Sequence, residues 1–253
     1  MFEKEIKSLI ELGKEKREFL RENFRGYFIS AMLAGAYVGF GVLLSGTVGA
    51  YLDGTDFEKI VMGLAFPIAL SLVVMGKAEL FTSTTFILGL SSMYKEIEWK
   101  QSIKGWVVCY LGNWAGAFIL ALLFVGTGAM DGAVGKYIAE WSESKTHYTA
   151  IQLLSKGILC NMLVCLVTWC TNKMKSETAK LIIIFWCLFA LLTSGFEHSI
   201  ANMTTLTLGI FKNHGFNILL GGYLHNLIWV TLGNVLGGVI FIALPYYLIA
   251  NRK

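Results

Sequence analysis

The sequence predicts an all-α membrane protein, with six transmembrane helices in two inverted halves of three helices each. Three observations lead to this class. Hydrophobic residues make up 55% of the chain and charged residues 15%, and the mean hydropathy is +0.62, as in helical membrane proteins. Two apolar segments exceed the length of one membrane crossing and are broken by polar residues near their centres. Short motifs of the first half return in the second half.

The chain begins with a charged segment, residues 1–26, that carries seven Lys or Arg residues and six Glu residues. This composition predicts an amphipathic helix, and the segment lacks the apolar core of a cleavable signal peptide. We expect the helix to lie on the cytoplasmic membrane surface or to cover a pore mouth.

Six apolar spans follow, and two of them are broken. A hydrocarbon core of about 30 Å needs only about 20 helical residues, so a much longer apolar segment with a polar centre predicts two half-helices and a linker. The breaks cover residues 76–83 and 195–202 and begin at Gly76 and Gly195. Ionisable residues at this depth indicate a channel or transporter. The predicted spans are 27–51, 60–92 (broken), 105–128, 151–171, 181–211 (broken) and 223–250.

Positive charges determine the predicted orientation. Fifteen Lys and Arg residues lie in the N-terminal segment, in the two even-numbered loops and at the C-terminus, where Arg252 and Lys253 stand, against four on the opposite side. This asymmetry places both termini in the cytoplasm. The net charge of +4 is concentrated in these segments, so it indicates topology and not nucleic-acid binding. We expect a multi-pass protein of the cell membrane, surrounded by membrane lipids.

The two halves of the chain repeat each other. The motif LGNWAG at 111–116 returns as LGNVLG at 232–237, and Glu79 returns as His198 at nearly the same offset. A constant offset indicates duplication. Because three spans per copy is an odd number, the second copy must be inverted in the membrane. The predicted organisation is a single transmembrane domain over residues 1–253, with repeats at 27–128 and 151–250.

Three motifs carry a resemblance to a known family. They are AELFTS at 78–83, GILCNMLVCL at 157–166 and GFEHSIANM at 195–203. With these motifs in this order, the chain resembles the formate/nitrite transporter family over essentially its whole length. The resemblance implies a homopentamer of six-helix protomers with an aquaporin-like inverted-repeat fold. It also implies one pore per protomer for small monovalent anions.

The chemistry of the breaks suits an anion pathway. Moving a carboxylate-sized ion into a medium of low dielectric constant has an idealised cost of order 20 kcal/mol, so a pore needs positive potential, hydrogen-bond donors or a means of neutralising the ion. The half-helices that follow the breaks are expected to direct unpaired N–H groups at the centre. Lys156 adds a charge near the outer end of the fourth span, and His198 can donate a proton near neutral pH.

Each polar candidate has a structural alternative. An intramembrane histidine in a helix break is functional by default, and the alternative for His198 is a buried imidazole bonded to a neighbour. Thr82, placed by the resemblance on the loop that faces His198, and Asn161 can each donate a hydrogen bond to the anion or join helices to each other. Asn202, just beyond the second break, is a further candidate for the pathway.

The remaining candidates are structural or apolar. Glu79 and Glu197 are expected to support the breaks by accepting backbone N–H groups, and not to contact an anion that they would repel. By family position, apolar side chains should form constrictions on either side of the histidine, which can gate by dewetting; an ordinary core role is an equal alternative for Leu70. The predicted constriction residues are Phe66, Leu70, Leu80, Phe81 and Leu191.

Two residues depart from the family pattern. Lys77 stands where the resemblance leads us to expect Gly, so it must reach the interface, pair with Glu79 or face the pathway. Leu191 stands where many members carry Phe, which indicates a less aromatic constriction. Lys156 resembles the nitrite and hydrosulfide branches more than the formate branch, so nitrite and hydrosulfide are the preferred expected substrates, with formate as a further candidate.

Two other function classes remain open. A neutral-solute channel would share the inverted-repeat plan, but the chain lacks the paired Asn-Pro-Ala motifs of aquaporins. An intramembrane enzyme could be built around Glu197 and His198, but no nucleophile or metal-ligand set accompanies them. The five cysteines lie inside spans without Cys-x-x-Cys spacing. We therefore expect no enzyme activity, no metal and no cofactor.

Overall fold

The structure is a computed structural model that describes residues 2–250, so Arg252 and Lys253 of the charge count lie outside the described residues. The described chain is helical and contains no strand. The α-helices are α1 (Glu3–Glu22), α2 (Phe24–Tyr51), α3 (Glu58–Ala65), α4 (Ile68–Met75), α5 (Phe81–Met93), α6 (Trp99–Gly126), α7 (Ala133–Thr146), α8 (Ala150–Lys173), α9 (Glu177–Thr193), α10 (Ser199–Phe211), α11 (Leu220–Gly238) and α12 (Leu244–Ala250).

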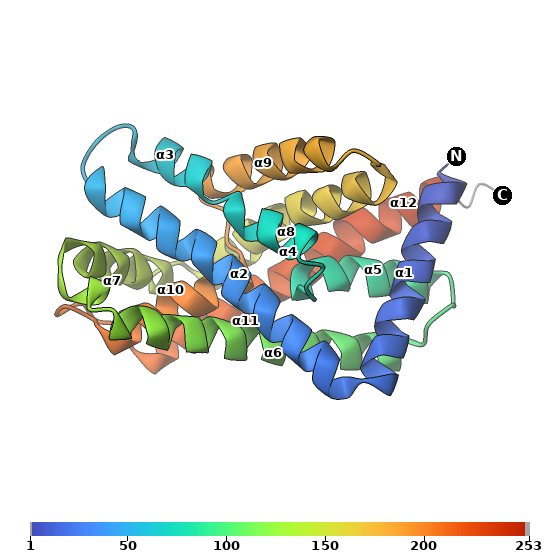
Figure 1. The fold of residues 1–253 in the computed structure, drawn as a ribbon, viewed down its shortest axis with the longest axis horizontal. Coiled ribbons are helices and arrows are strands. Elements are labelled where there is room, and N and C mark those ends of the chain that lie inside the picture. Colours follow the sequence, from blue (N-terminus) through green and yellow to red (C-terminus); the bar gives the residue numbers. More distant parts are fainter. Residues whose placement is uncertain (1, 251–253) are drawn as a thin grey trace.

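Several helices are apolar and long enough to cross a membrane. Within residues 2–250, five helical segments meet both conditions: Phe24–Tyr51, Glu58–Met75, Trp99–Gly126, Ala150–Lys173 and Leu220–Ala250. α9 has 17 residues and α10 has 13, so each is shorter than a full crossing. Figure 1 shows α2, α6 and α11 running along the long axis of the molecule. These helices indicate a multi-pass membrane protein.

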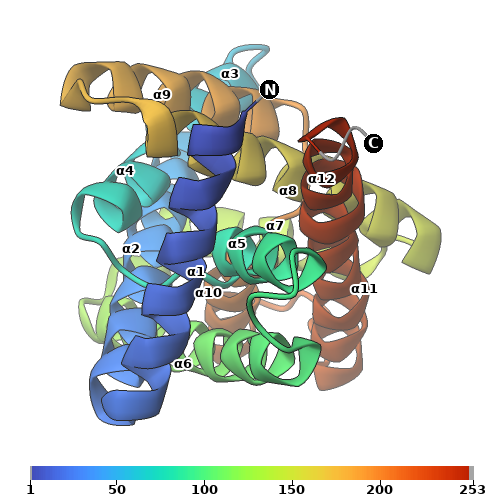
Figure 2. The ribbon, with the colours of Figure 1, turned by 90° about the vertical axis from the view of Figure 1, so that its right-hand side faces the viewer.

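The first helix is docked on one end of the bundle. Figures 1 and 2 show α1 lying across the end at which α12 also stops. Its apolar side chains Ile6, Leu9 and Ile10 are buried with residues of α5 and α8, so the amphipathic pattern of the charged segment is satisfied by protein contacts. The helix ends at Glu22, because Asn23 leaves the helical conformation and its side chain accepts the N–H of Gly26 at the start of α2.

Both predicted breaks are present, but they are shorter than the sequence suggests. The first covers residues 76–80 between α4 and α5, and the second covers residues 194–198 between α9 and α10. Residues 81–83 and 199–202, expected in the linkers, form the first turns of α5 and α10. The extended backbone of Leu80 (φ −102°, ψ 127°) and of His198 (φ −105°, ψ 113°) marks where each new helix begins.

Three local features were not predicted from the apolar pattern. The half-helix before the first break is interrupted between Ala65 and Ile68, where Pro67 lacks the N–H needed to continue the helix. α7 lies in the connection between the two halves, a stretch for which no helix was predicted. The helical region after α11 also includes a π-helical turn at Val239–Ala243.

An asparagine holds the first break. The side-chain oxygen of Asn113 on α6 accepts the N–H of Phe81 at 2.9 Å, and its Nδ2 donates to the carbonyl of Glu79 at 2.9 Å. Asn113 is fully buried. Its amide therefore satisfies one donor and one acceptor that the interruption of the helix leaves without backbone partners.

A second asparagine bonds to the backbone groups of the second break in the same way. Asn234 on α11 accepts the N–H of Ser199 at 3.0 Å and donates to the carbonyl of Glu197 at 3.1 Å. Of the N–H groups expected to be unpaired at the starts of α5 and α10, the first in each helix is therefore bonded to an asparagine oxygen.

The matching bonds also correct the predicted register of the repeat. The backbone carbonyls of Glu79 and Glu197 each accept a hydrogen bond from an asparagine Nδ2, and Leu80 and His198 each precede the first residue of a half-helix. Glu79 therefore corresponds to Glu197, and Leu80 corresponds to His198. The pairing of Glu79 with His198 is wrong by one residue.

Candidate functional site

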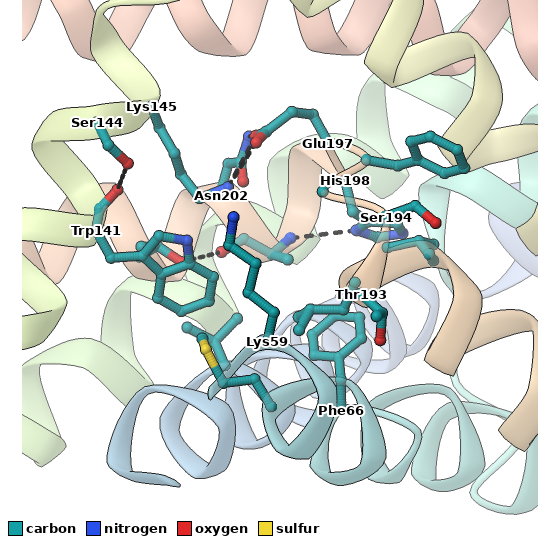
Figure 3. Close-up of a pocket in the computed structure, with 18 of the residues that line it drawn as sticks. Lys59, Phe66, Trp141, Ser144, Lys145, Thr193, Ser194, Glu197, His198 and Asn202 are labelled. Atoms are coloured by element: carbon teal, nitrogen blue, oxygen red, sulfur yellow. Dashed lines mark hydrogen bonds and ion pairs between the residues drawn. The ribbon is translucent and has the colours of Figure 1, made fainter. Parts of the chain in front are cut away.

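A cavity of about 530 Å³ opens beside the second break. Its walls come from α3, α7, the start of α8, the end of α9 and the first turns of α10. Figure 3 shows labelled side chains from α3, α7, the end of α9 and α10 around the cavity. His198 lies in the wall and is itself buried, with 5% of its surface exposed.

Both ring nitrogens of His198 are engaged. Nδ1 accepts the N–H of Ala201 at 3.2 Å, so the histidine caps its own half-helix. Nε2 lies 3.1 Å from the hydroxyl oxygen of Thr82. Because Nδ1 uses its lone pair as an acceptor, the neutral ring carries its proton on Nε2, and that proton points to Thr82.

Thr82 and Asn161 stand behind His198 and do not line the cavity. Asn161 Nδ2 lies 3.2 Å from the carbonyl of Thr82, 3.2 Å from the hydroxyl of Thr85 and 2.6 Å from the carbonyl of Asn234. Its amide nitrogen is thus occupied by contacts between helices. These contacts match the structural alternative for Asn161, and Thr82 reaches the site through His198.

Glu197 is bonded to side chains and not to the backbone N–H groups that were expected. Lys145 Nζ lies 2.8 and 2.9 Å from its two carboxylate oxygens, and Asn202 donates to the same carboxylate at 2.5 Å. Asn226 connects the group further, since Asn202 lies 2.8 Å from its side-chain oxygen and its Nδ2 donates to the carbonyl of Lys145 at 3.0 Å. All four side chains are buried. A buried charge needs paired and hydrogen-bonded partners of this kind.

The sequence interpretation did not single out Lys145, which is one of the four Lys and Arg residues counted on the side opposite the termini. One signal was available: Tyr137, Trp141 and Lys145 recur at every fourth residue, the spacing of one helix face. All three line the cavity. The ammonium of Lys145 also lies 5.2 Å from the centre of the Trp141 ring.

At the first break, the carboxylate of Glu79 is likewise bonded to a lysine side chain and not to the backbone N–H groups that were expected. Its carboxylate lies 2.6 Å from Nζ of Lys16 on α1, and its backbone N–H donates to the hydroxyl of Ser30. The pairing of Glu79 with Lys77 that the sequence allowed is not formed. Lys77 is exposed and has a left-handed backbone conformation with φ of 50°.

Lys156 holds the second break from two sides. Its Nζ donates to the carbonyl of Gly195 at 2.9 Å, and its own carbonyl accepts the N–H of Glu197 at 3.3 Å. Gly195 has φ of 69°, a conformation that favours glycine. The ammonium also lies 4.5 Å from the centre of the Tyr148 ring. Lys156 lines the cavity, as does Asn202.

Of the five predicted constriction residues, two line this cavity. Phe66 and Leu191 are each 2% exposed and form apolar parts of its wall. Leu70, Leu80 and Phe81 are buried in the same apolar core but do not reach the cavity. Gly76 lies in the first break, outside this cavity, where an added Cβ would stand 2.7 Å from the carbonyl of Leu72.

The site offers donors and a water-accessible cavity, without an obvious set of metal ligands. Across residues 2–250, no group of three or more His, Cys, Asp or Glu side chains could hold a metal ion. The five cysteines are free thiols, and four of them are buried. The cavity lining includes a neutral imidazole, the amide of Asn202 and three lysines, of which Lys145 and Lys156 already have bonded ammonium groups.

The chain is similar in sequence to a known family of transporters. A family model described as formate/nitrite transporter matches residues 3–248. The nitrite transporter NirC of Salmonella typhimurium is 41% identical, with 88% of this chain and 82% of that protein covered. The formate channel FocA of Escherichia coli is 31% identical, with 89% of this chain and 87% of that protein covered. These relatives are transporters and channels, not enzymes.

Solved structures give the same result. A channel described as an FNT family ion channel superposes with a TM-score of 0.92 at 38% identity, over 97% of this chain and 98% of the other. A pentameric formate channel with formate bound gives a TM-score of 0.81 at 30% identity, over 90% and 97%. With a family model over nearly its full length and a relative at 41% identity, this chain belongs to the formate/nitrite transporter family.

Proposed function

We propose that this protein passes small monovalent anions of weak acids across the cell membrane, with nitrite as the preferred substrate and hydrosulfide and formate as further substrates. The observation that carries the proposal is the neutral His198, which lines the cavity together with the apolar side chains of Phe66 and Leu191 and whose Nε2–H is bonded to Thr82. The similarity to a nitrite transporter supports the choice of nitrite.

The proposed pathway works by hydrogen bonding to the anion. Lys145 and Glu197 neutralise each other, so neither is free to trap the ion. An anion that replaces Thr82 as the partner of Nε2–H gains a donor in a dehydrated position, where such a bond is stronger than in water. Protonating Nδ1 would break its bond to Ala201. The geometry therefore favours His198 as a donor of one hydrogen bond over a role as a store of protons.

The proposed path is narrowed on both sides of His198. Phe66 and Leu191 form the apolar wall on the cavity side, and Leu70, Leu80 and Phe81 are proposed for the opposite side, in the core next to the first break. Thr82 and Asn202 supply uncharged donors near the histidine. Asn161 positions Thr82, and Gly76, Gly195, Glu79 and Glu197 maintain the shape of the breaks.

The proposed architecture is six spans in a 3+3 inverted repeat over residues 1–253. Matching asparagines at the two breaks support the repeat. The excess of Lys and Arg on one side supports cytoplasmic termini, and α1 belongs to that side. The cavity then faces the outside. The proposed assembly is a homopentamer, supported by the pentameric neighbour and by exposed apolar side chains such as Phe40 and Leu111 on α2 and α6.

A flux measurement tests the proposal. Purified protein in liposomes should transport nitrite, hydrosulfide and formate, and it should exclude glycerol. Stopped-flow light scattering measures glycerol and water permeation in the same vesicles. Rapid glycerol permeation without anion flux would contradict the proposal and would identify a neutral-solute channel instead.

A further inference from the structure

Three lysines line the cavity: Lys59, Lys145 and Lys156. The ammonium groups of two of these lysines already have hydrogen-bond partners within the protein. Lys145 is buried and bonded to Glu197 at 2.8 Å, and Lys156 donates to the carbonyl of Gly195 at 2.9 Å. Their ammonium groups maintain the second break, so they are not available to follow a moving ion.

Lys59 differs from the other two. It is the second residue of α3, and in Figure 3 its side chain extends from that helix into the cavity. Across residues 2–250, its Nζ has no hydrogen bond and no ion pair. An ammonium on a flexible stem, with three free donors and a cavity in front of it, can accept a mobile anion as its partner.

The carboxylates around the cavity do not neutralise Lys59 by direct pairing. Four line it: Asp53, Glu58, Glu140 and Glu197. Glu197 is bonded to Lys145, and Glu58 accepts the hydroxyl of Tyr137 at 2.5 Å. Asp53 and Glu140 are exposed, and neither lies within 4.0 Å of Nζ of Lys59.

The exposed acids oppose the entry of anions into the cavity. An approaching monovalent anion meets the exposed carboxylates of Asp53 and Glu140, which repel it, before it can reach the buried donor at His198. A free cation that is exposed and lines the same cavity raises the local concentration of anions and so compensates this repulsion. Lys59 is the cavity-lining lysine that is free to do so.

We propose that Lys59 is the outer capture residue: its ammonium binds the incoming small monovalent anion and delivers it to Nε2–H of His198. This inference rests on the proposed function, since it names a further residue of the same path. Lys59 would act on binding and not on passage, because it is exposed, whereas Phe66 and Leu191 beside the buried His198 are themselves buried. It therefore affects the nitrite concentration at half-maximal flux more than the maximal flux.

Charge replacement after folding provides the test. Lys59→Cys is reconstituted in liposomes with this side facing outward, and nitrite flux is measured before and after treatment with a methanethiosulfonate reagent that carries either an ammonium or a sulfonate group. Four of the five native cysteines are buried, and wild-type protein treated in parallel measures any reaction at the native thiols. Lys136→Cys is the matched control, because Lys136 is exposed on α7 but does not line the cavity.

We expect Lys59→Cys to raise the half-saturating nitrite concentration by about tenfold, the lower end of the range for electrostatic steering. The ammonium reagent should return it toward the wild-type value, and the sulfonate reagent should raise it further. Lys136→Cys should respond to neither. Recovery by the ammonium reagent also shows that the variant is folded.

Two outcomes would overturn the inference. One is an unchanged half-saturating concentration in Lys59→Cys, and the other is an equal response to both reagents. The wild-type measurement keeps these failures separate from a failure of the proposed function. If the wild-type protein carries no nitrite, hydrosulfide or formate, the function itself is wrong; if it does, only the assignment of Lys59 fails.

Discussion

Nε2 of His198 lies 3.1 Å from the hydroxyl oxygen of Thr82, a contact that joins the two broken segments across 116 residues of sequence. The imidazole is fixed from its other side by the N–H of Ala201. One proton, on Nε2, is therefore presented where the half-helices meet.

The hydroxyl of Thr82 should be needed for transport. Thr82→Val keeps the shape and removes the partner of His198, at a cost of about 1 kcal/mol in stability for one lost hydrogen bond. We expect nitrite flux to fall by about tenfold, since a loss of about 1.4 kcal/mol in binding corresponds to that factor. Thr82→Ser should retain most of the flux. Equal flux in the Val and wild-type proteins would show that Thr82 has only a packing role.

The Lys145–Glu197 pair should be tested for stability. Lys145→Met leaves the buried carboxylate of Glu197 without its cation, and breaking a buried pair in this way costs about 3–5 kcal/mol. Adding Glu197→Gln removes the uncompensated charge, so the double variant should regain most of the loss. Thermal unfolding in mild detergent measures both. A double variant as unstable as the single variant would contradict the pairing.

Two break residues have left-handed backbone conformations, and they should respond in opposite directions. Gly195→Ala adds a Cβ at φ of 69°, and Lys77→Gly relieves one at φ of 50°. Each change is expected to be worth about 1 kcal/mol, destabilising in the first case and stabilising in the second. Gly132→Ala is the control, because its φ is −107° and a Cβ there meets nothing within 4 Å. Unfolding midpoints that do not separate in this order would contradict these backbone assignments.

Lys156 should affect all permeant anions alike. A charge at a cavity of low dielectric constant acts on any monovalent anion, and Lys156→Glu reverses that charge beside Gly195. Nitrite, hydrosulfide and formate flux should fall by similar factors, with a weaker dependence on salt. A loss confined to one anion would make Lys156 a selectivity residue.

The family and the positions of the breaks could be predicted from the sequence. Over-long apolar segments and a polar motif in each are local features, and His198 and Glu79 stand within those motifs. The exact ends of the breaks could not be predicted, because asparagines 32 and 35 residues away, at Asn113 and Asn234, supply the bonds that begin α5 and α10.

The lysine partners of Glu79 and Glu197 could not be predicted from the local sequence either. Lys16 and Lys145 come from helices outside the predicted spans, 63 and 52 residues from the carboxylates that they pair with. Only tertiary packing brings these charges together, and an amphipathic pattern by itself predicts a solvated lysine. The tautomer of His198 likewise depends on the Ala201 N–H that the half-helix presents to it.

The central claim is that His198 supplies the donor on which anion passage depends. His198→Phe keeps the bulk of the ring and removes the donor, and the variant should fold and assemble. The most direct measurement is nitrite flux in liposomes for the wild type and the variant at the same pH. The account predicts rapid flux in the wild type and slow flux in the variant; an unaltered rate in the variant would contradict it.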